Sequence, residues 1–126
     1  MQREFKFRAW STENNKMMDW EHIQSFRNFQ KLLTLPFVKV MQYTGFKDKD
    51  GKEIYEGDIL SCKVWVDGKW EDSKEPVMFK DGCFVLDWSF QKDGSYYEIM
   101  TKEIEGKKIL GNIYQNPELV NRAVGV

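Results

Sequence analysis

The sequence predicts a mainly β protein, built as a small antiparallel barrel or sandwich of short strands. One observation is that apolar and polar residues alternate, with a period of two, over many short stretches. Another is the composition: 126 residues, of which 41% are hydrophobic and 15% aromatic, suffice for one domain with a single core and no disulfide or structural metal. A third is that Gly-containing turns separate the stretches, at Asp50-Gly51, Asp67-Gly68, Asp81-Gly82 and Asp93-Gly94.

Residues 1–36 are predicted to form a β-hairpin and then a short helical or irregular excursion. Asn14 and Asn15 suit the tip of the hairpin, because Asn tolerates left-handed backbone, and residues 17–20 can return as its second strand. Between residues 21 and 35 apolar side chains recur every three or four positions, and Pro36 closes the segment, which favours one short helix. In the first strand, Phe5, Phe7 and Ala9 share one face, and Lys6, Arg8 and Trp10 share the other.

Residues 37–126 are predicted to form the barrel-like part and to end in a short helix. The turn at residues 81–82 gives the clearest hairpin, because a two-residue Asp-Gly loop joins two β-rich arms. Asn116 is expected to cap the terminal helix, with Pro117 at its first position and Glu118 in its first turn. Strands are expected at residues 37–43, 54–55, 59–66, 77–80, 83–88, 96–100 and 108–114, with a kink at residues 56–58.

Charge and end sequences indicate the class of protein. Nineteen basic and twenty acidic residues give a net charge of -1, so no strongly basic field drives nonspecific nucleic-acid binding. No stretch approaches the ~18 apolar residues of a membrane span, and the first residues alternate charged with apolar side chains, unlike a secretory signal. The only cysteines are Cys62 and Cys83, which form no CxxC motif. We expect a cytoplasmic protein without a membrane partner.

Catalytic, cofactor and metal sites are not expected. His22 is the only histidine, and both cysteines fall on apolar strand patterns, where Cys behaves as a small buried hydrophobe. Nucleotide-binding and hydrolase fingerprints are absent. Residues 48–51 have the carboxylate spacing and Gly of a calcium loop, but with Gly51 at the sixth position the twelfth is Gly57 instead of Glu. We therefore expect a non-enzymatic protein that has no cofactor.

The densest acidic group consists of Glu53, Glu56 and Asp58. Paired carboxylates are the groups that glycosidases and metal nucleases use. The favoured interpretation is structural: Gly57 allows a tight turn, and Asp58 accepts hydrogen bonds from nearby backbone amides at the start of a strand. A carboxylate-based hydrolase or nuclease is kept as a third, minor hypothesis.

A candidate binding face lies on the first hairpin and comprises Lys6, Arg8, Trp10 and Lys16. Cations beside an aromatic ring are the ingredients of a surface that follows phosphates and stacks bases. Arg and Trp also anchor protein interfaces, and Trp10 can instead cover the edge of the core. The aromatic side chains are too bulky to fit together inside one small barrel, so some must face outward or toward a partner; this set is Trp10, Tyr43, Tyr55, Trp65 and Trp88.

Three blocks of the sequence resemble the YopX family of small phage and prophage proteins. The blocks are Phe7 to Trp10 with Lys16 to Met18; Met41 to Gly45 with Lys47, Asp48 and Gly51 to Ile59; and Gly111 to Tyr114 with Asn116 to Leu119. They reach from the first strand to the last helix. The resemblance implies a single YopX-like domain over residues 1–126, with a small antiparallel SH3-like barrel. It implies no catalytic residue, because the family has no established activity.

Beside the minor hypothesis of a carboxylate-based enzyme, these observations give two main hypotheses for function. The first is a non-enzymatic accessory protein of a phage or prophage, which acts in the bacterial host cytoplasm by binding a host or phage protein or by forming a homo-oligomer. The alternative is a nucleic-acid-binding module that uses the basic and aromatic face of the first hairpin.

Overall fold

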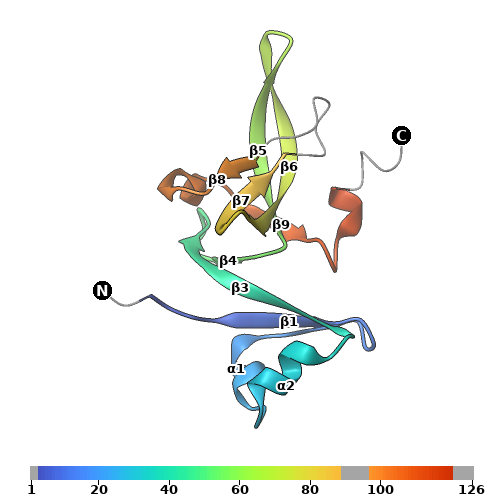
Figure 1. The fold of residues 1–126 in the computed structure, drawn as a ribbon. Coiled ribbons are helices and arrows are strands. Elements are labelled where there is room, and N and C mark those ends of the chain that lie inside the picture. The colour runs from blue at the N-terminus through green and yellow to red at the C-terminus, as the bar shows by residue number, and fades with distance from the viewer. Residues whose placement is uncertain (1–2, 89–96, 121–126) are drawn as a thin grey trace.

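The computed structural model describes residues 3–88 and 97–120, which form two antiparallel sheets (Figure 1). The prediction of a mainly β protein is confirmed, and one of the sheets is a half-barrel. The first sheet has the strand order β2-β1-β3-β4, and the second has the order β8-β7-β6-β5-β9. The strands are β1 (Phe7–Ser11), β2 (Lys16–Met18), β3 (Val38–Lys47), β4 (Glu53–Tyr55), β5 (Asp58–Val66), β6 (Lys69–Lys80), β7 (Cys83–Asp87), β8 (Tyr97–Ile99) and β9 (Ile109–Asn112).

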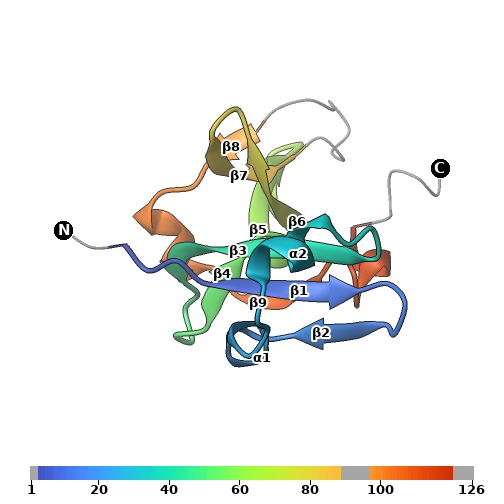
Figure 2. The same ribbon diagram turned by 60° about the horizontal axis from the view of Figure 1, so that its bottom comes forward.

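Two short helices, α1 (Trp20–Gln24) and α2 (Phe29–Thr34), stand where one helix was predicted. The single helix is wrong because two N-caps divide the segment: Asp19 accepts a hydrogen bond from the backbone of α1, and Asn28 from that of α2. The break also changes which side chains are buried, since Ile23 and Leu32 face the sheet. Both helices cover the face of the first sheet that is turned away from the second sheet (Figures 1 and 2).

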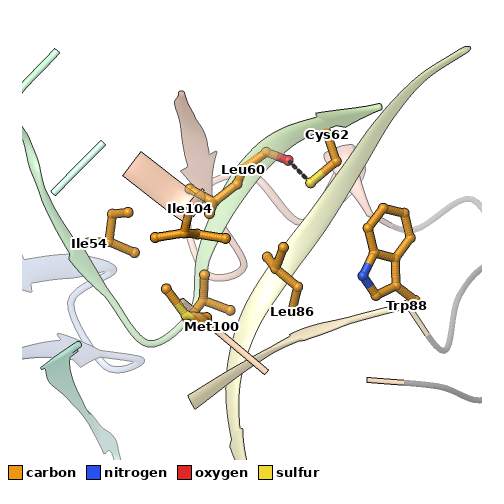
Figure 3. Packing of buried hydrophobic residues seen from close by; sticks show 8 residues of the cluster. Ile54, Leu60, Cys62, Leu86, Trp88, Met100 and Ile104 are labelled. Carbon is orange, nitrogen blue, oxygen red and sulfur yellow. Dashed lines mark hydrogen bonds between the residues drawn. The ribbon is translucent and has the colours of Figure 1, made fainter. Parts of the chain in front are cut away.

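The hydrophobic core consists of two clusters in the described part of the chain, where a single core was expected. One cluster lies between the helices and the first sheet and contains Ala9, Ile23 and Leu32. The other is enclosed by the second sheet, by β4 of the first sheet and by the short 3-10 helix η1 (Lys102–Gly106), as Figure 3 shows. Its members are Ile54, Leu60, Cys62, Val77, Leu86, Trp88, Met100 and Ile104.

Strands β5 and β6 continue beyond the second sheet as a two-stranded ribbon (Figure 1). β9 pairs with β5 only at residues 58–60, and β7 pairs with β6 only from residue 77 onward. At the tip, Asp67 and Gly68 both have positive φ, 49° and 82°, as a two-residue hairpin turn requires. β6 is longer than the predicted strand at 77–80 because its polar first half pairs with β5 through the backbone ladder, which needs no apolar side chains.

The end of the described chain differs from the predicted helix. Residues 117–119 form only a 3-10 turn, η2 (Pro117–Leu119), and the side chain of Asn116 does not cap it. Instead the Asn116 Oδ1 accepts a hydrogen bond from the Asn112 backbone N–H at 3.1 Å. The predicted Asp93-Gly94 turn and the first residue of the strand expected at 96–100 lie outside the described residues. Among the helices that are described, none has the length and apolar character to cross a membrane.

Candidate functional site

Arg8 lies on the face of β1 that meets the second sheet, and its guanidinium joins the two sheets. Its Nη2 lies 2.7 Å from Asp58 Oδ1 and also donates to the Glu56 carbonyl at 3.2 Å. The guanidinium carbon is 5.0 Å from the centre of the Tyr55 ring. The Arg8 side chain is 15% exposed and that of Asp58 only 3%, so this is a largely desolvated ion pair.

The acidic group is bound to backbone amides and to a lysine. Asp58 Oδ2 accepts from the Tyr55 N–H at 2.8 Å, and Glu56 Oε1 accepts from the Gln42 N–H at 2.9 Å. Glu53 pairs with Lys6, whose pKa is raised by hydrogen bonds to Glu4 and Glu53. Burial raises the pKa of Asp58 and of Glu56. The hydrogen bond from the Tyr55 N–H to Asp58 is the one that the structural interpretation predicts, whereas Glu56 and Glu53 each bind a different partner, so the three carboxylates do not share one ligand-facing cluster.

The basic and aromatic face predicted on the first hairpin is not an open surface. Trp10 is 8% exposed and stacks on Tyr114, with ring centres 6.2 Å apart and planes at 17°. Lys6 and Arg8 are held in ion pairs, and only Lys16, on β2, is exposed. Of the two alternatives for Trp10, the one in which it covers the edge of the core holds, because the sheet is covered on both sides, by the helices on one and by the second sheet on the other.

A pocket of about 580 Å³ lies beside this junction. Its walls include the rings of Trp20 and Tyr55 and the charged groups of Lys6, Glu53 and Arg8. The Arg8 Nε is buried and has no hydrogen-bond partner among the described residues. The volume suits a small ligand, but the charges of Lys6 and Glu53 already neutralise each other across it.

No group of three or more metal-binding side chains occurs in residues 3–88 and 97–120. Asp48, the first carboxylate of the loop that has calcium-like spacing, accepts hydrogen bonds from the backbone N–H groups of Asp50, Lys52 and Ile109. It therefore closes the β3–β4 turn and ties it to β9. His22 is exposed and stacks on Phe26, with ring centres 5.6 Å apart.

The two cysteines differ in burial. Cys62 is 3% exposed, and burial raises the pKa of its thiol to about 11, so the thiol stays protonated at neutral pH. Its Sγ donates to the Leu60 carbonyl, as drawn in Figure 3. Cys83 is half-buried, and its Sγ donates to the Lys80 carbonyl at 3.4 Å.

Among the described residues, the most exposed aromatic group is a pair of tryptophans near the tip of the ribbon. Trp65 is 57% exposed and Trp70 66%; they lie directly opposite each other on β5 and β6, with ring centres 5.2 Å apart and planes at 75°. The expectation that some of the aromatic side chains face outward thus holds for Trp65, while Trp10, Tyr43, Tyr55 and Trp88 are buried. Trp70 was not singled out from the sequence, although the two-residue turn at 67–68 fixes it opposite Trp65.

Lysines gather on the same face of the ribbon, closer to the sheet. Lys63 pairs directly opposite Asp72, two residues from each tryptophan, and forms an ion pair with it. A pocket of about 490 Å³ adjoins them and is also lined by Lys49, Lys74 and Lys107. We call the surface formed by Trp65, Trp70, Asp72, Lys49, Lys63, Lys74 and Lys107 the ribbon face.

Comparison with known proteins identifies the family. The sequence model of the YopX protein family matches residues 6–121. The crystal structure of protein EF1440 from Enterococcus faecalis is similar, with a TM-score of 0.63 and 22% identity over 94% of this chain and 99% of that one. The crystal structure of protein yopX from Bacillus subtilis has a TM-score of 0.56 and 25% identity, covering 90% of this chain and 96% of that one. No curated protein matches the sequence. The family match spans nearly the whole chain, from β1 to the end of η2, and the chain therefore belongs to the YopX family.

Proposed function

We propose that this chain is a non-enzymatic accessory protein of a phage or prophage, which acts in the bacterial cytoplasm by association with a second copy of itself or with a host or phage protein. The fold that goes with this proposal is a single domain over residues 1–126, with an SH3-like barrel that follows an N-terminal β-hairpin. The observation that carries the proposal is the exposed Trp65–Trp70 pair. Tryptophan is enriched among the residues that dominate binding energy at protein interfaces.

The ribbon also offers strand edges for pairing. Its tip, residues 63–66 and 69–72, extends past the ends of the pairing with β9 and β7, and no other described strand flanks it. Backbone N–H and C=O groups along such an edge can pair with a strand from another chain.

A second copy is the partner that we favour. Antiparallel pairing of two identical edges produces a two-fold symmetric dimer, in which each ribbon contributes the same residues. The tip carries both signs of charge, with Lys63 and Lys69 close to Glu71 and Asp72. An antiparallel copy can therefore bring unlike charges together without a net repulsion.

Light scattering coupled to size-exclusion chromatography, over a range of protein concentrations, tests self-association. We expect a dimer for the natural chain and a monomer for the double variant Trp65→Ser, Trp70→Ser. Truncation of an anchoring Trp costs about 2 kcal/mol or more, so each substitution raises the dissociation constant by roughly 30-fold. The matched control, called the helix control, is Phe26→Ser with Leu33→Ser, because these side chains are 40% and 48% exposed, Phe26 between α1 and α2 and Leu33 on α2.

Two results count against the proposal. If the natural chain is monomeric at every concentration, self-association is wrong; if a bait chain then also retains no protein from a bacterial lysate, association as a whole is wrong. Equal dissociation of the helix control and the tryptophan variant would show that the ribbon is not the interface.

A further inference from the structure

We propose that the ribbon face binds single-stranded nucleic acid, with lysines that contact the phosphates and with Trp65 and Trp70 stacked on bases. This goes beyond association between proteins and does not require it: Lys63 and the two tryptophans also lie at the proposed dimer edge, but Lys49, Lys74 and Lys107 do not. The sequence suggested the same chemistry for the first hairpin, and the tertiary structure provides it on a different surface.

The ribbon face is basic although the whole chain is slightly acidic. Four lysines, Lys49, Lys63, Lys74 and Lys107, line its pocket together with one carboxylate among the described residues, that of Asp72, so lysines outnumber carboxylates in this lining by four to one. The chain as a whole has a net charge of -1. A local concentration of positive charge over a concave surface attracts a polyanion even when the net charge of the whole protein does not.

The opposite side of the ribbon has a different character. The pocket there is lined by Val64 and Val66 and by the charged residues Glu71, Asp72, Glu118 and Lys74, so carboxylates outnumber lysines in it by three to one. Since successive side chains of a strand point to opposite faces, the alternating sequence of β5 sorts lysine and tryptophan to one side and valine to the other. Lys63 and the two tryptophans therefore lie on one face of the ribbon, whereas the other face carries the valines with Lys69 and Glu71.

Two lysines of this face, Lys49 and Lys63, are exposed, whereas Lys6 and Arg8 of the first hairpin are half-buried. None of the described ion pairs involves Lys49 or Lys107, and Lys63 pairs only with the highly exposed Asp72. An exposed ion pair of this kind contributes little, and a phosphate can replace the carboxylate at small cost. Arg8, by contrast, is committed to the buried Asp58.

The tryptophans favour a single strand over a duplex. Lys63 and Trp65 lie two residues apart on one face of β5, about 6.6 Å along the strand. At this spacing the Lys63 ammonium can contact a phosphate while the Trp65 ring stacks on the base of a neighbouring nucleotide. Bases of a single strand are free to stack on aromatic rings, whereas the bases of a duplex are already stacked on each other.

Fluorescence anisotropy with a labelled oligothymidine of about 16 nucleotides tests the proposal. The measurements are made at protein concentrations at which light scattering shows one oligomeric state, in a series of salt concentrations. If four lysines each contact a phosphate, the slope of log K against log salt is about -2.8, from 0.7 per contact on a single strand. A duplex of the same sequence should bind more weakly.

Two triple variants separate this face from general electrostatics. Lys49→Gln, Lys63→Gln, Lys107→Gln should reduce the slope to about -0.7 and the affinity at low salt at least tenfold. Lys16→Gln, Lys31→Gln, Lys39→Gln removes the same charge from exposed positions of the other half of the molecule and should leave both unchanged. Equal losses in the two triple variants would overturn the proposal.

Further variants test stacking and do not rely on a loss of charge. Trp65→Ala or Trp70→Ala should each weaken binding by roughly 5- to 150-fold. Asp72→Asn should strengthen binding several-fold, because it removes the one carboxylate of the pocket and releases Lys63. The proposal is refuted by absence of binding at low salt, by duplex binding as tight as that of the single strand, or by an unchanged affinity in Asp72→Asn.

Failure here is distinguishable from failure of self-association. If tryptophan substitution dissociates the dimer and no oligonucleotide binds, the ribbon is a protein interface alone and this inference is wrong. If the oligonucleotide binds and the chain is monomeric throughout, nucleic-acid binding stands and self-association falls.

Discussion

The Arg8 side chain connects β1 to residues 55–58, where it contacts the Tyr55 ring, the Glu56 carbonyl and the Asp58 carboxylate. Substitution of Arg8 by methionine removes these contacts. Methionine keeps much of the volume of the arginine stem but removes the guanidinium, so the change isolates the charge and its hydrogen bonds. Asp58 then keeps a single bond, from the Tyr55 N–H, and lies 3% exposed without its counter-charge.

We expect Arg8→Met to destabilise the fold by about 3 kcal/mol. Loss of one partner from a buried ion pair typically costs about 3–5 kcal/mol, and the 15% exposure of Arg8 favours the lower end. With an unfolding entropy of about 2.1 cal/mol/K per residue, a chain of 126 residues has about 0.26 kcal/mol/K. The midpoint of thermal unfolding should therefore fall by about 11 °C.

The loss should depend on pH in a specific direction. Burial raises the pKa of Asp58 from its ordinary 3.8, and the Arg8 charge opposes this, so removal of Arg8 raises the pKa further. A carboxyl whose folded pKa lies above its unfolded one stabilises the fold while it is protonated, and this stability is lost as the pH rises through the folded pKa. The effect of Arg8→Met should thus be full at about pH 7 and smaller near pH 4.

Urea denaturation of four chains measures the coupling: the natural chain, Arg8→Met, Asp58→Asn and the double variant. We expect the double variant to be more stable than the sum of the single losses predicts, since neither charge is left alone. Lys16→Met, at an exposed position of β2, is the control and should change stability by less than about 0.5 kcal/mol. Additive losses, or a loss for Arg8→Met that does not change with pH, would refute the reasoning.

Three further predictions concern a turn, a close contact and a thiol. Asp48→Ala should cost about 3 kcal/mol in urea denaturation, because three backbone N–H groups lose their acceptor. Burial raises the pKa of Asp48, but the hydrogen bonds from those N–H groups together lower it more, so the pKa in the folded state lies below the ordinary 3.8. The stability difference between the natural chain and Asp48→Ala should therefore shrink as the pH falls through this folded-state pKa. Gly57→Ala should lower the thermal midpoint by an amount equivalent to about 1–3 kcal/mol, because Gly57 has φ +85° and an added Cβ would lie 3.2 Å from the Met41 sulfur. Under native conditions near pH 8, a disulfide reagent that is followed by absorbance should modify Cys83 before Cys62, whose buried thiol has a pKa of about 11; equal rates would contradict its burial.

Much of the secondary structure could be predicted because strand periodicity and turn chemistry are local. The two-residue turns at 67–68 and 81–82 depend only on backbone conformation, and both connect antiparallel strands. The helix expected over residues 21–35 was wrong because periodicity alone does not register a cap: Asp19 and Asn28 each begin a separate short helix.

The candidate binding face was placed on the first hairpin from the sequence, whereas the exposed tryptophans lie on the ribbon. The sequence pointed to cations beside exposed aromatic rings, and the residues chosen were those with the clearest alternation, Lys6, Arg8 and Trp10. Lys49 and Lys107 could not be assigned to a face with Lys63, because they come from a turn and from the segment after η1, which only the fold brings to the base of the ribbon.

The sequence by itself determined the strand-rich class, the hairpin turns and the surplus of aromatic side chains, since each of these follows from local periodicity or from composition. Tertiary structure decided which of the aromatic side chains are exposed. A strand sequence defines two faces but not what covers them: β1 is covered on both, so Trp10 is buried, whereas the tip of the ribbon extends past its neighbouring described strands and Trp65 and Trp70 stay in solvent. Burial depends on packing between elements distant in sequence, and alternation carries no information about it.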